Sequence, residues 1–194
     1  MKIKKNLAKK LSALGLGISA ALAGGYLIIP YEGSVTNSQG VHVAYKDPVG
    51  IDTACYGQTG KDLYGRTIRA GMRYTEDECL KMLTTSIERF ERSVDRLVKV
   101  DYASYYQKAA LISFAYNVGE GNLATSTLLR NLNSGNHIAA CNELSRWVYA
   151  QKRKLRGLEI RREEERRWCL GEVPYDPQTT LGELLELVSL TTKK

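Results

Sequence analysis

Glu32, Asp47 and Thr53 are the residues whose types and spacing best suggest a reaction. All three lie within residues 31–60, YEGSVTNSQGVHVAYKDPVGIDTACYGQTG, where Gly, Pro and short apolar runs predict turns and small strands. Cleavage of a glycosidic bond uses two acids on different elements across a cleft. One carboxylic acid protonates the leaving oxygen, and one carboxylate helps a water molecule to attack. Glu32 and Asp47 can supply this pair if the chain places them across one cleft.

Short elements must position these side chains. The pattern predicts strands over residues 41–45 and 51–56, joined by a turn over residues 47–50. Taken alone, Asp47-Pro48 would be interpreted as a turn initiator and nothing more. Thr53 and the run YGQTG at residues 56–60 favour the chemical interpretation instead.

The same stretch resembles the active-site segment of the phage lysozymes, the T4-lysozyme-like muramidases of glycoside hydrolase family 24. The resemblance rests on Glu32 with its following Gly, on AYKD at residues 44–47 and on VGIDTACYGQTG at residues 49–60. It implies that Glu32 is the general acid and Asp47 the second carboxylate. It also implies that Thr53 helps Asp47 to position the attacking water.

Three features depart from that family pattern. Cys55 stands where the family usually has Gly, and Gln58 stands where it often has His. The run SVTNSQG at residues 34–40 resembles an insertion, which makes the separation of Glu32 and Asp47 longer than usual.

Further blocks extend the resemblance from about Glu32 to Cys169. These blocks are SFAYNVGEGN at residues 113–122, RWVYA at residues 146–150, and a closing helix with Gly157-Leu158, Arg161-Arg162-Glu163 and Glu165-Arg166. The first block implies that Asn117, Gly119 and Gly121 lie on the wall of the sugar cleft. A purely structural role, in which the glycines end one helix and restart the chain, would also explain Gly119 and Gly121.

The resemblance implies an α+β, lysozyme-like fold. In this fold a small β-hairpin subdomain carries the catalytic cleft beside a mainly helical domain, here residues 31–173. The implied reaction is hydrolysis of the β-1,4 bond between N-acetylmuramic acid and N-acetylglucosamine in peptidoglycan. Inversion of configuration is implied, without a metal or cofactor. We expect the enzyme to be a monomer.

Residues 1–30 predict a segment that enters the membrane. A lysine cluster precedes the uncharged run LSALGLGISAALAGGYLII at residues 11–29, whose 19 residues are just long enough to cross a bilayer. Four glycines and four alanines make this run a weak transmembrane helix. The positive flank favours a cytoplasmic N-terminus. Three interpretations stay open: a permanent anchor, a signal peptide cleaved after Ala23, and a weak anchor that leaves the membrane uncut.

The run also resembles the signal-arrest-release (SAR) segments of certain phage endolysins, the interpretation that we favour. It implies passage through the host export machinery, residence in the host inner membrane and later release to the periplasm. While the run is in the membrane, Glu32 would be held at the bilayer surface, away from Asp47 and Thr53. Some SAR endolysins are kept inactive by a cysteine in this segment that exchanges disulfides on release. Residues 11–29 contain no Cys, so we expect the membrane position of the segment alone to keep this enzyme inactive. After release the segment should pack against the domain and let Glu32 reach the cleft.

The charge distribution argues against a nucleic-acid ligand. The chain has 194 residues and a net charge of +7, and five of its 28 basic residues lie within the first ten positions. The other 23 nearly balance the 21 acidic residues. A nucleic-acid-binding protein is expected to carry its positive charge on the folded domain.

The four cysteines predict disulfides. They form no C-x-x-C pair, and His42 and His137 do not lie at metal-site spacing from them, which argues against a zinc site. An even number of cysteines in an exported chain favours disulfide bonds. Three pairings are possible, and the sequence does not choose between them. We expect the two pairs that are near in sequence, as the most economical arrangement: Cys55 with Cys79 and Cys141 with Cys169.

The remaining chain predicts helices. A capping box at Thr75 opens a helix with a buried stripe from Leu80 to Leu97. Further helices are expected over residues 102–118, 137–150 and 180–190, the last within a tail at residues 174–194 to which no function is assigned. Residues 152–167 carry eight basic and four acidic residues. We interpret these charges mainly as a solvated helix face with ion pairs four residues apart.

Two other classes of protein compete with a muramidase. A lytic transglycosylase cleaves the same polymer with one Glu and no water, and the pair of Asp47 and Thr53 argues against it. A non-enzymatic, membrane-tethered wall-binding lysis protein would need no carboxylate pair. The mass of the product separates the first class, and the effect of Glu32→Gln on lysis separates the second.

Overall fold

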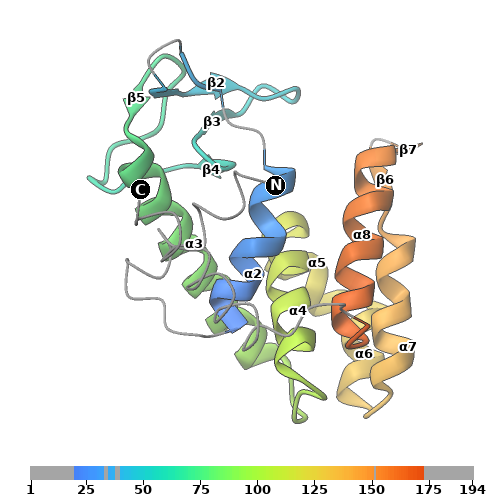
Figure 1. The fold of residues 1–194 in the computed structure, drawn as a ribbon. Coiled ribbons are helices and arrows are strands. Elements are labelled where there is room, and N and C mark those ends of the chain that lie inside the picture. The colour runs from blue at the N-terminus through green and yellow to red at the C-terminus, as the bar shows by residue number, and fades with distance from the viewer. Residues whose placement is uncertain (1–19, 33–34, 38–39, 151, 173–194) are drawn as a thin grey trace, which may run out of the picture.

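The structure, a computed structural model, describes residues 20–32, 35–37, 40–150 and 152–172 (Figure 1). Short strands gather at one end of the molecule and most helices at the other, and helix α3 (Glu76–Leu97) leads from the first region into the second. This is the α+β arrangement expected from the sequence. Most of the expected membrane run and the expected helix over residues 180–190 lie outside the described residues.

The strand region consists of two small antiparallel sheets. The three-stranded sheet has the order β2 (Tyr45–Lys46), β3 (Asp52–Ala54), β4 (Gln58–Thr59), and the other pairs β1 (His42–Val43) with β5 (Arg73–Tyr74). Tyr45 lies opposite Thr53 in the β2–β3 hairpin. The strands predicted over residues 41–58 are therefore confirmed, although each is shorter than expected.

Helix α3 begins and packs as its sequence predicts. The Thr75 hydroxyl accepts a hydrogen bond from the Glu78 backbone N–H at 3.2 Å, and the Glu78 carboxylate accepts one from the Thr75 N–H at 2.7 Å. This reciprocal pair satisfies donors that a helix N-terminus otherwise leaves free. Leu80, Leu83 and Ile87 are fully buried, so the predicted stripe faces the core.

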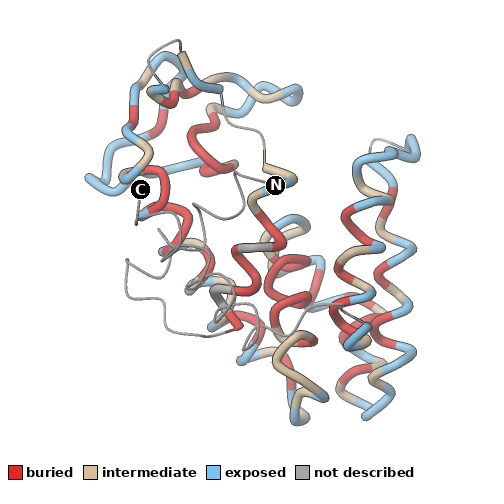
Figure 2. Tube along the Cα trace, viewed as in Figure 1, coloured by how far each residue is buried: buried red, intermediate tan, exposed pale blue. Residues whose placement is uncertain are grey.

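The helical region is built around α4 (Tyr105–Val118), which is buried over Ala109–Ala115 and contacts α3 and three other helices. The tube in Figure 2 shows this buried centre, with exposed residues toward the outside. The other elements are α2 (Ala20–Ile28), η1 (Ile29–Tyr31), α5 (Glu120–Thr125), α6 (Thr127–Asn133), α7 (His137–Asn142), η2 (Glu143–Arg146), β6 (Tyr149–Ala150), β7 (Arg153–Lys154) and α8 (Arg156–Cys169).

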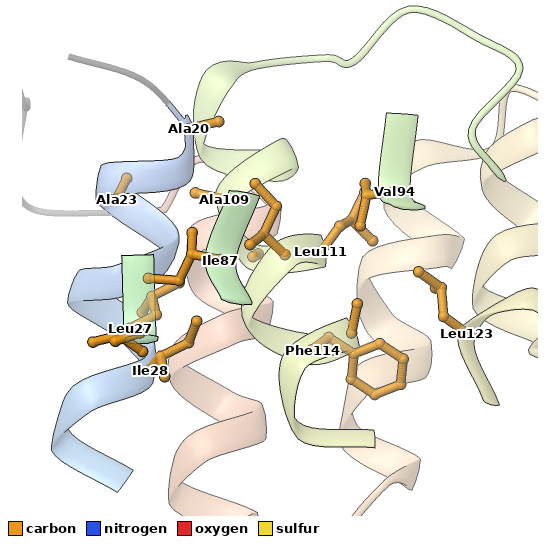
Figure 3. Packing of buried hydrophobic residues seen from close by; sticks show 14 of the residues in the cluster. Ala20, Ala23, Leu27, Ile28, Ile87, Val94, Ala109, Leu111, Phe114 and Leu123 are labelled. Atoms are coloured by element: carbon orange, nitrogen blue, oxygen red, sulfur yellow. The ribbon is translucent and has the colours of Figure 1, made fainter. Parts of the chain in front are cut away.

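Helix α2, the described part of the expected membrane run, packs into the core. Leu27 and Ile28 are fully buried, and α2 lies against α4 and α3 (Figure 3). Gly24 permits the close approach, because a Cβ there would lie 3.0 Å from Cγ2 of Ile112. Packing of this segment against the domain was expected and is confirmed for Ala20–Ile28. Within the part of the chain that the structure describes, no helix has the length and apolar character needed to cross a membrane.

The helix expected over residues 137–150 is wrong in its second half. Helix α7 ends at Asn142, a 3₁₀ turn follows, and Tyr149–Ala150 then pairs with Arg153–Lys154 as a small hairpin. Trp147 leaves the helical region of backbone space at φ −92° and ψ 50°, while its ring packs edge-on against Phe114 at 5.1 Å. A tertiary contact therefore overrides the helical pattern here.

The interpretation of residues 152–167 as a solvated helix also needs correction. Helix α8 begins only at Arg156, and Arg161, Arg162 and Glu165 are buried. These side chains face α4 rather than water. Ser113 on α4, for example, donates a hydrogen bond to Glu165. The exposed pair of Arg166 and Glu163 fits the original interpretation.

The two expected disulfides are confirmed. Cys55 is bonded to Cys79 and Cys141 to Cys169, closing sequence separations of 24 and 28 residues. Cys55 has φ +53°, a left-handed conformation that favours Gly. The family's usual Gly at this position therefore has a backbone reason, and the disulfide to α3 holds Cys55 in the same conformation.

Candidate active site

Glu32 lies directly after η1, at the junction of the helical and strand regions. Its side chain is 17% exposed, and its Oε1 accepts a hydrogen bond from Nη1 of Arg161 on α8 at 2.9 Å. Its Oε2 faces the turn between β3 and β4, where a Cβ on Gly57 would lie only 2.7 Å away. Gly57 has φ +81°, so both its backbone conformation and the carboxylate require the absence of a side chain.

Asp47 lies at the tip of the β2–β3 hairpin. Its Oδ1 accepts hydrogen bonds from the backbone N–H groups of Val49 at 2.9 Å and Ile51 at 2.8 Å. These bonds make it an Asx-type turn residue, as the Asp-Pro pair predicts. Among the described residues no hydrogen bond is made to the other carboxylate oxygen, Oδ2.

Thr53 lies on β3 and is only 4% exposed. Its hydroxyl donates a hydrogen bond to the Ile51 carbonyl at 3.2 Å. Since its cross-strand partner is Tyr45, which immediately precedes Lys46 and Asp47, the hairpin register brings Thr53 and Asp47 to neighbouring positions.

Both carboxylates act electrostatically on Tyr45. Burial raises the pKa of the Tyr45 hydroxyl, and the negative charges of Glu32 and Asp47 raise it further. Both acids therefore lie close enough to Tyr45 to interact with it electrostatically. Tyr45, the cross-strand partner of Thr53, therefore lies within electrostatic range of both acids, which come from two different regions of the fold.

Two cavities lie near Glu32. The large cavity, about 740 Å³, lies between the β4 region and α3, and its lining includes Gly57, Thr59, Lys61, Arg89 and Tyr116. The small cavity, about 300 Å³, is lined by Tyr31, Glu32, Asn117, Leu155, Gly157, Leu158 and Arg161. Glu32 lines the small cavity, and its Oε2 faces Gly57, which lines the large one, so its carboxylate lies on the side of the small cavity nearest the large one.

Hydrogen bonds join the two regions beside Glu32. Gln58 Nε2 donates to the Tyr116 hydroxyl at 2.7 Å, and Tyr116 donates to the Tyr56 carbonyl at 2.6 Å. Gln58 therefore links β4 to α4 from the position where the family often has His. Burial raises the pKa of Tyr116, with Glu32 as the next cause, so the hydroxyl stays protonated near this acid.

The three expected cleft-wall residues have different surroundings. Asn117 lines the small cavity and accepts a hydrogen bond from Arg162. Gly119 caps α4 at φ +87°, and Gly121 lies in α5; neither lines either cavity. The structural role therefore fits Gly119, which ends α4 and precedes α5, and of the three residues only Asn117 shares a cavity with Glu32.

Sequence reasoning missed the charge cluster that contains Arg161, the partner of Glu32. Arg161, Arg162 and Glu165 were treated as part of a charged run, although they occupy the buried face of α8. The signal was present in the spacing: Leu158 and Trp168 are apolar ends of a stripe whose middle positions are these three charged residues.

Comparison with known proteins agrees with this fold. The profile of the phage lysozyme family matches residues 37–165. The chain therefore belongs to the phage lysozyme family, and its class is that of a muramidase, a glycoside hydrolase.

Individual relatives include SAR-endolysins and a lysozyme of known structure. The SAR-endolysin of Bacteriophage PS119 is 42% identical over 164 residues, which cover 81% of this chain and 95% of the relative. The SAR-endolysin of Enterobacteria phage P21 is 40% identical over 164 residues, covering 81% and 96%. A crystal structure of a P22 lysozyme mutant has 30% identity and a TM-score of 0.63, covering 76% of this chain and 94% of that one.

Proposed function

We propose that this protein is a phage endolysin that hydrolyses the β-1,4 bond between N-acetylmuramic acid and N-acetylglucosamine in peptidoglycan. The observation that carries the proposal is the position of the Glu32 carboxylate, on the side of the small cavity nearest the large one. In this proposal a polymer chain occupies both cavities and passes this carboxylate. Cleavage in the middle of a long glycan strand requires such an arrangement.

In the proposed reaction Glu32 is the general acid. It donates its proton to the glycosidic oxygen as the bond to the anomeric carbon breaks. Proton transfer leaves Glu32 as a carboxylate, and Arg161, with Nη1 2.9 Å from Oε1, stabilises that charge. Arg161 therefore favours the state that Glu32 reaches after donating its proton.

Asp47 and Thr53 act on the attacking water. The two backbone hydrogen bonds to Oδ1 fix the orientation of Asp47, and Oδ2 can then take a proton from the water. The Thr53 oxygen can accept a second hydrogen bond from the same molecule. Attack from the face opposite the leaving oxygen inverts the anomeric configuration.

The large cavity has cationic side chains that could bind the peptide stems as well as the sugars of the substrate. Its lining includes Lys61 and Arg89, while its one acid, Asp62, is buried and already bonded to Arg66. Neutral sugars need no cations, but the peptide stems of peptidoglycan carry carboxylates. We therefore extend the proposed substrate to glycan strands that bear peptide stems.

We also propose that residues 11–29 hold the enzyme inactive in the host inner membrane until release to the periplasm. Support comes from the SAR-endolysin relatives and from the position of α2, which leads through η1 directly to Glu32. A membrane-inserted segment cannot also fill the space that α2 occupies against α4. In this mechanism the docking of α2 after release brings Glu32 to the cleft.

The experiment compares Glu32→Gln with Glu163→Gln on purified peptidoglycan. Glu163 pairs with Arg166 on the exposed side of α8, so its variant controls for loss of one charge from the protein. We expect Glu32→Gln to release no soluble muropeptides while keeping its melting temperature, and Glu163→Gln to behave as wild type. Near wild-type release by Glu32→Gln would contradict the assignment. Products one water lighter than those of hydrolysis would identify a transglycosylase.

A further inference from the structure

A buried charge cluster lies behind Glu32. On α8 the side chains of Arg161, Arg162 and Glu165 are 3%, 0% and 0% exposed. Buried charges are unfavourable unless each one is paired and hydrogen-bonded. The cluster is electrically balanced only when Glu32 is counted, with two guanidinium groups facing two carboxylates.

Glu165 lies between the two arginines. Its Oε1 accepts hydrogen bonds from Nε of Arg161 at 3.2 Å and from the Ser113 hydroxyl at 2.7 Å. Its Oε2 is 2.8 Å from Nη1 of Arg162, an ion pair whose atoms are not aligned as a hydrogen bond. Burial raises the pKa of the Glu165 carboxyl, and the two guanidinium groups oppose that effect.

Each arginine holds one residue of the small cavity. Arg161 donates to Glu32, and Arg162 donates to the amide oxygen of Asn117. Glu165 itself lines neither cavity. One carboxylate outside the substrate space therefore anchors the two side chains that orient Glu32 and Asn117.

We propose that Glu165 is a positioning residue that keeps Arg161 paired while Glu32 gains and loses its proton. The inference rests on the proposed role of Glu32 as general acid. Once Glu32 is protonated, it no longer neutralises Arg161, and a buried guanidinium without a carboxylate is strongly unfavourable. Glu165 remains the carboxylate partner of Arg161 in that state. Glu32 can therefore be protonated while the other contacts of the cluster stay in place.

Other groups that face Glu32 do not replace Glu165. Tyr45 on β2 and Tyr116 on α4 are neutral hydroxyls, because burial and the charge of Glu32 raise the pKa of each. Asp47, which also acts on Tyr45, adds negative charge from the hairpin. Arg161 is the positive group in hydrogen-bonding contact with Glu32, and among the described residues Glu165 is its only other carboxylate partner.

The test changes Glu165 and follows the protonation of Glu32. In Glu165→Gln, Arg161 keeps Glu32 as its only carboxylate, so the alkaline limb of the kcat/KM profile on peptidoglycan should move to lower pH by about one unit. Arg161→Met should move it in the opposite direction. Glu163→Gln, on the exposed side of the same helix, should leave the profile unchanged.

A second variant covers the case in which Glu165→Gln does not fold. Arg162→Met combined with Glu165→Met removes a buried pair together, a change that proteins often tolerate. Arg161 again depends on Glu32 alone, so the alkaline limb should move to lower pH as in the single variant. A folded double variant with the wild-type profile would overturn the inference.

A titration of the Glu32 carboxyl by ¹³C NMR without substrate makes the result independent of turnover. We expect its midpoint to fall in both Glu165 variants and to rise in Arg161→Met. Midpoints that coincide with wild type would overturn the role of Glu165 even in an active enzyme. If the wild-type protein cleaves no peptidoglycan but the variants show these shifts, the proposed function is contradicted. The electrostatic coupling of Glu165 to Glu32 through Arg161 then still holds.

Discussion

The two sides of the proposed site are held by different means. On the acid side, Glu32 is fixed by Arg161, which lies 129 residues away in the chain, and Arg161 is fixed in turn by Glu165. On the hairpin side, Asp47 is fixed by the N–H groups of Val49 and Ile51, two and four residues further on. One side is built from long-range charge contacts, and the other from local backbone hydrogen bonds.

This difference assigns different sensitivities to the two sides. The acid side requires α2, α4 and α8 to be packed together, because its residues come from segments at both ends of the domain. The hairpin side needs only its own turn and cross-strand register. We therefore expect changes in helix packing to disturb Glu32 first and to leave Asp47 in place.

The largest expected effect after Glu32→Gln comes from Asp47→Asn. The Asn carbonyl oxygen can keep both hydrogen bonds that Oδ1 accepts, so only the charge is lost and the hairpin should remain. We expect kcat to fall by about 100-fold or more, without a change in the midpoint of urea unfolding. Asp47→Ala should show the same loss of kcat and also a lower unfolding midpoint. Equal unfolding midpoints for the two variants would contradict the local design of this side.

The disulfides offer the next test. Replacing both cysteines of either disulfide, Cys55–Cys79 or Cys141–Cys169, by Ser should lower the unfolding free energy by about 2–4 kcal/mol. The two losses should be similar, because the closed loops are of similar length. Activity measured well below the melting temperature should separate the variants. Loss of Cys55–Cys79 frees the turn that faces Glu32 and should lower kcat several-fold more than loss of the other pair. An equal loss of kcat would mean that the turn does not depend on its bond to α3.

Gly24 tests the packing of the acid side. A Leu at this position must displace Ile112, which is fully buried, so Gly24→Leu should lower the unfolding free energy of the released protein by about 1–3 kcal/mol. The matched variant is Gly121→Leu, also in a helix, where an added Cβ meets no atom within 4 Å. Urea unfolding of both proteins provides the comparison, and equal destabilisation would mean that α2 does not dock as described.

The smallest effect is expected at Arg89, which lines the large cavity beyond both sides of the site. Arg89→Gln should raise KM for intact peptidoglycan about two- to fivefold, the range of a single exposed ion pair. It should leave KM unchanged for glycan strands without carboxylates, in which the peptides are removed and the freed lactyl carboxyl of each muramic acid is amidated. Arg92→Gln, also exposed on α3 but outside the cavity lining, is the control for overall charge. An equal change in KM on both substrates would mean that Arg89 does not bind the peptide carboxylates.

The same comparison explains what the sequence could predict. The strands, the capping box at Thr75 and the turn at Asp47 depend on neighbouring residues, and each was found where its pattern indicated. The two disulfides are a different case, since the sequence left three pairings open and the most economical of them is the one present. The roles assigned to Glu32, Asp47 and Thr53 stay predictions that the variants above test.

The failures concern residues whose state is decided by distant partners. Charged side chains at helical spacing normally indicate a solvated face. Leu158 and Trp168 mark the ends of a buried stripe, but they do not reveal that Phe114 and Ser113 on another helix cover the charged residues between them. The helix expected through Ala150 failed for a related reason, since Trp147 packs on Phe114 and the chain turns into a hairpin. In both cases the surface of α4 decides the outcome.

The docked helix α2 has a thermodynamic consequence under the proposed release mechanism. Leu27 and Ile28 are the kind of side chains that hold a helix in lipid, and they are also fully buried against the domain. Each such burial is worth about 1.5–3 kcal/mol, so the domain competes with the bilayer for the same residues. Stronger docking would draw the segment out sooner, and weaker docking would delay it. The lysis schedule and the stability of the active enzyme are therefore linked quantities, and selection cannot adjust one without moving the other.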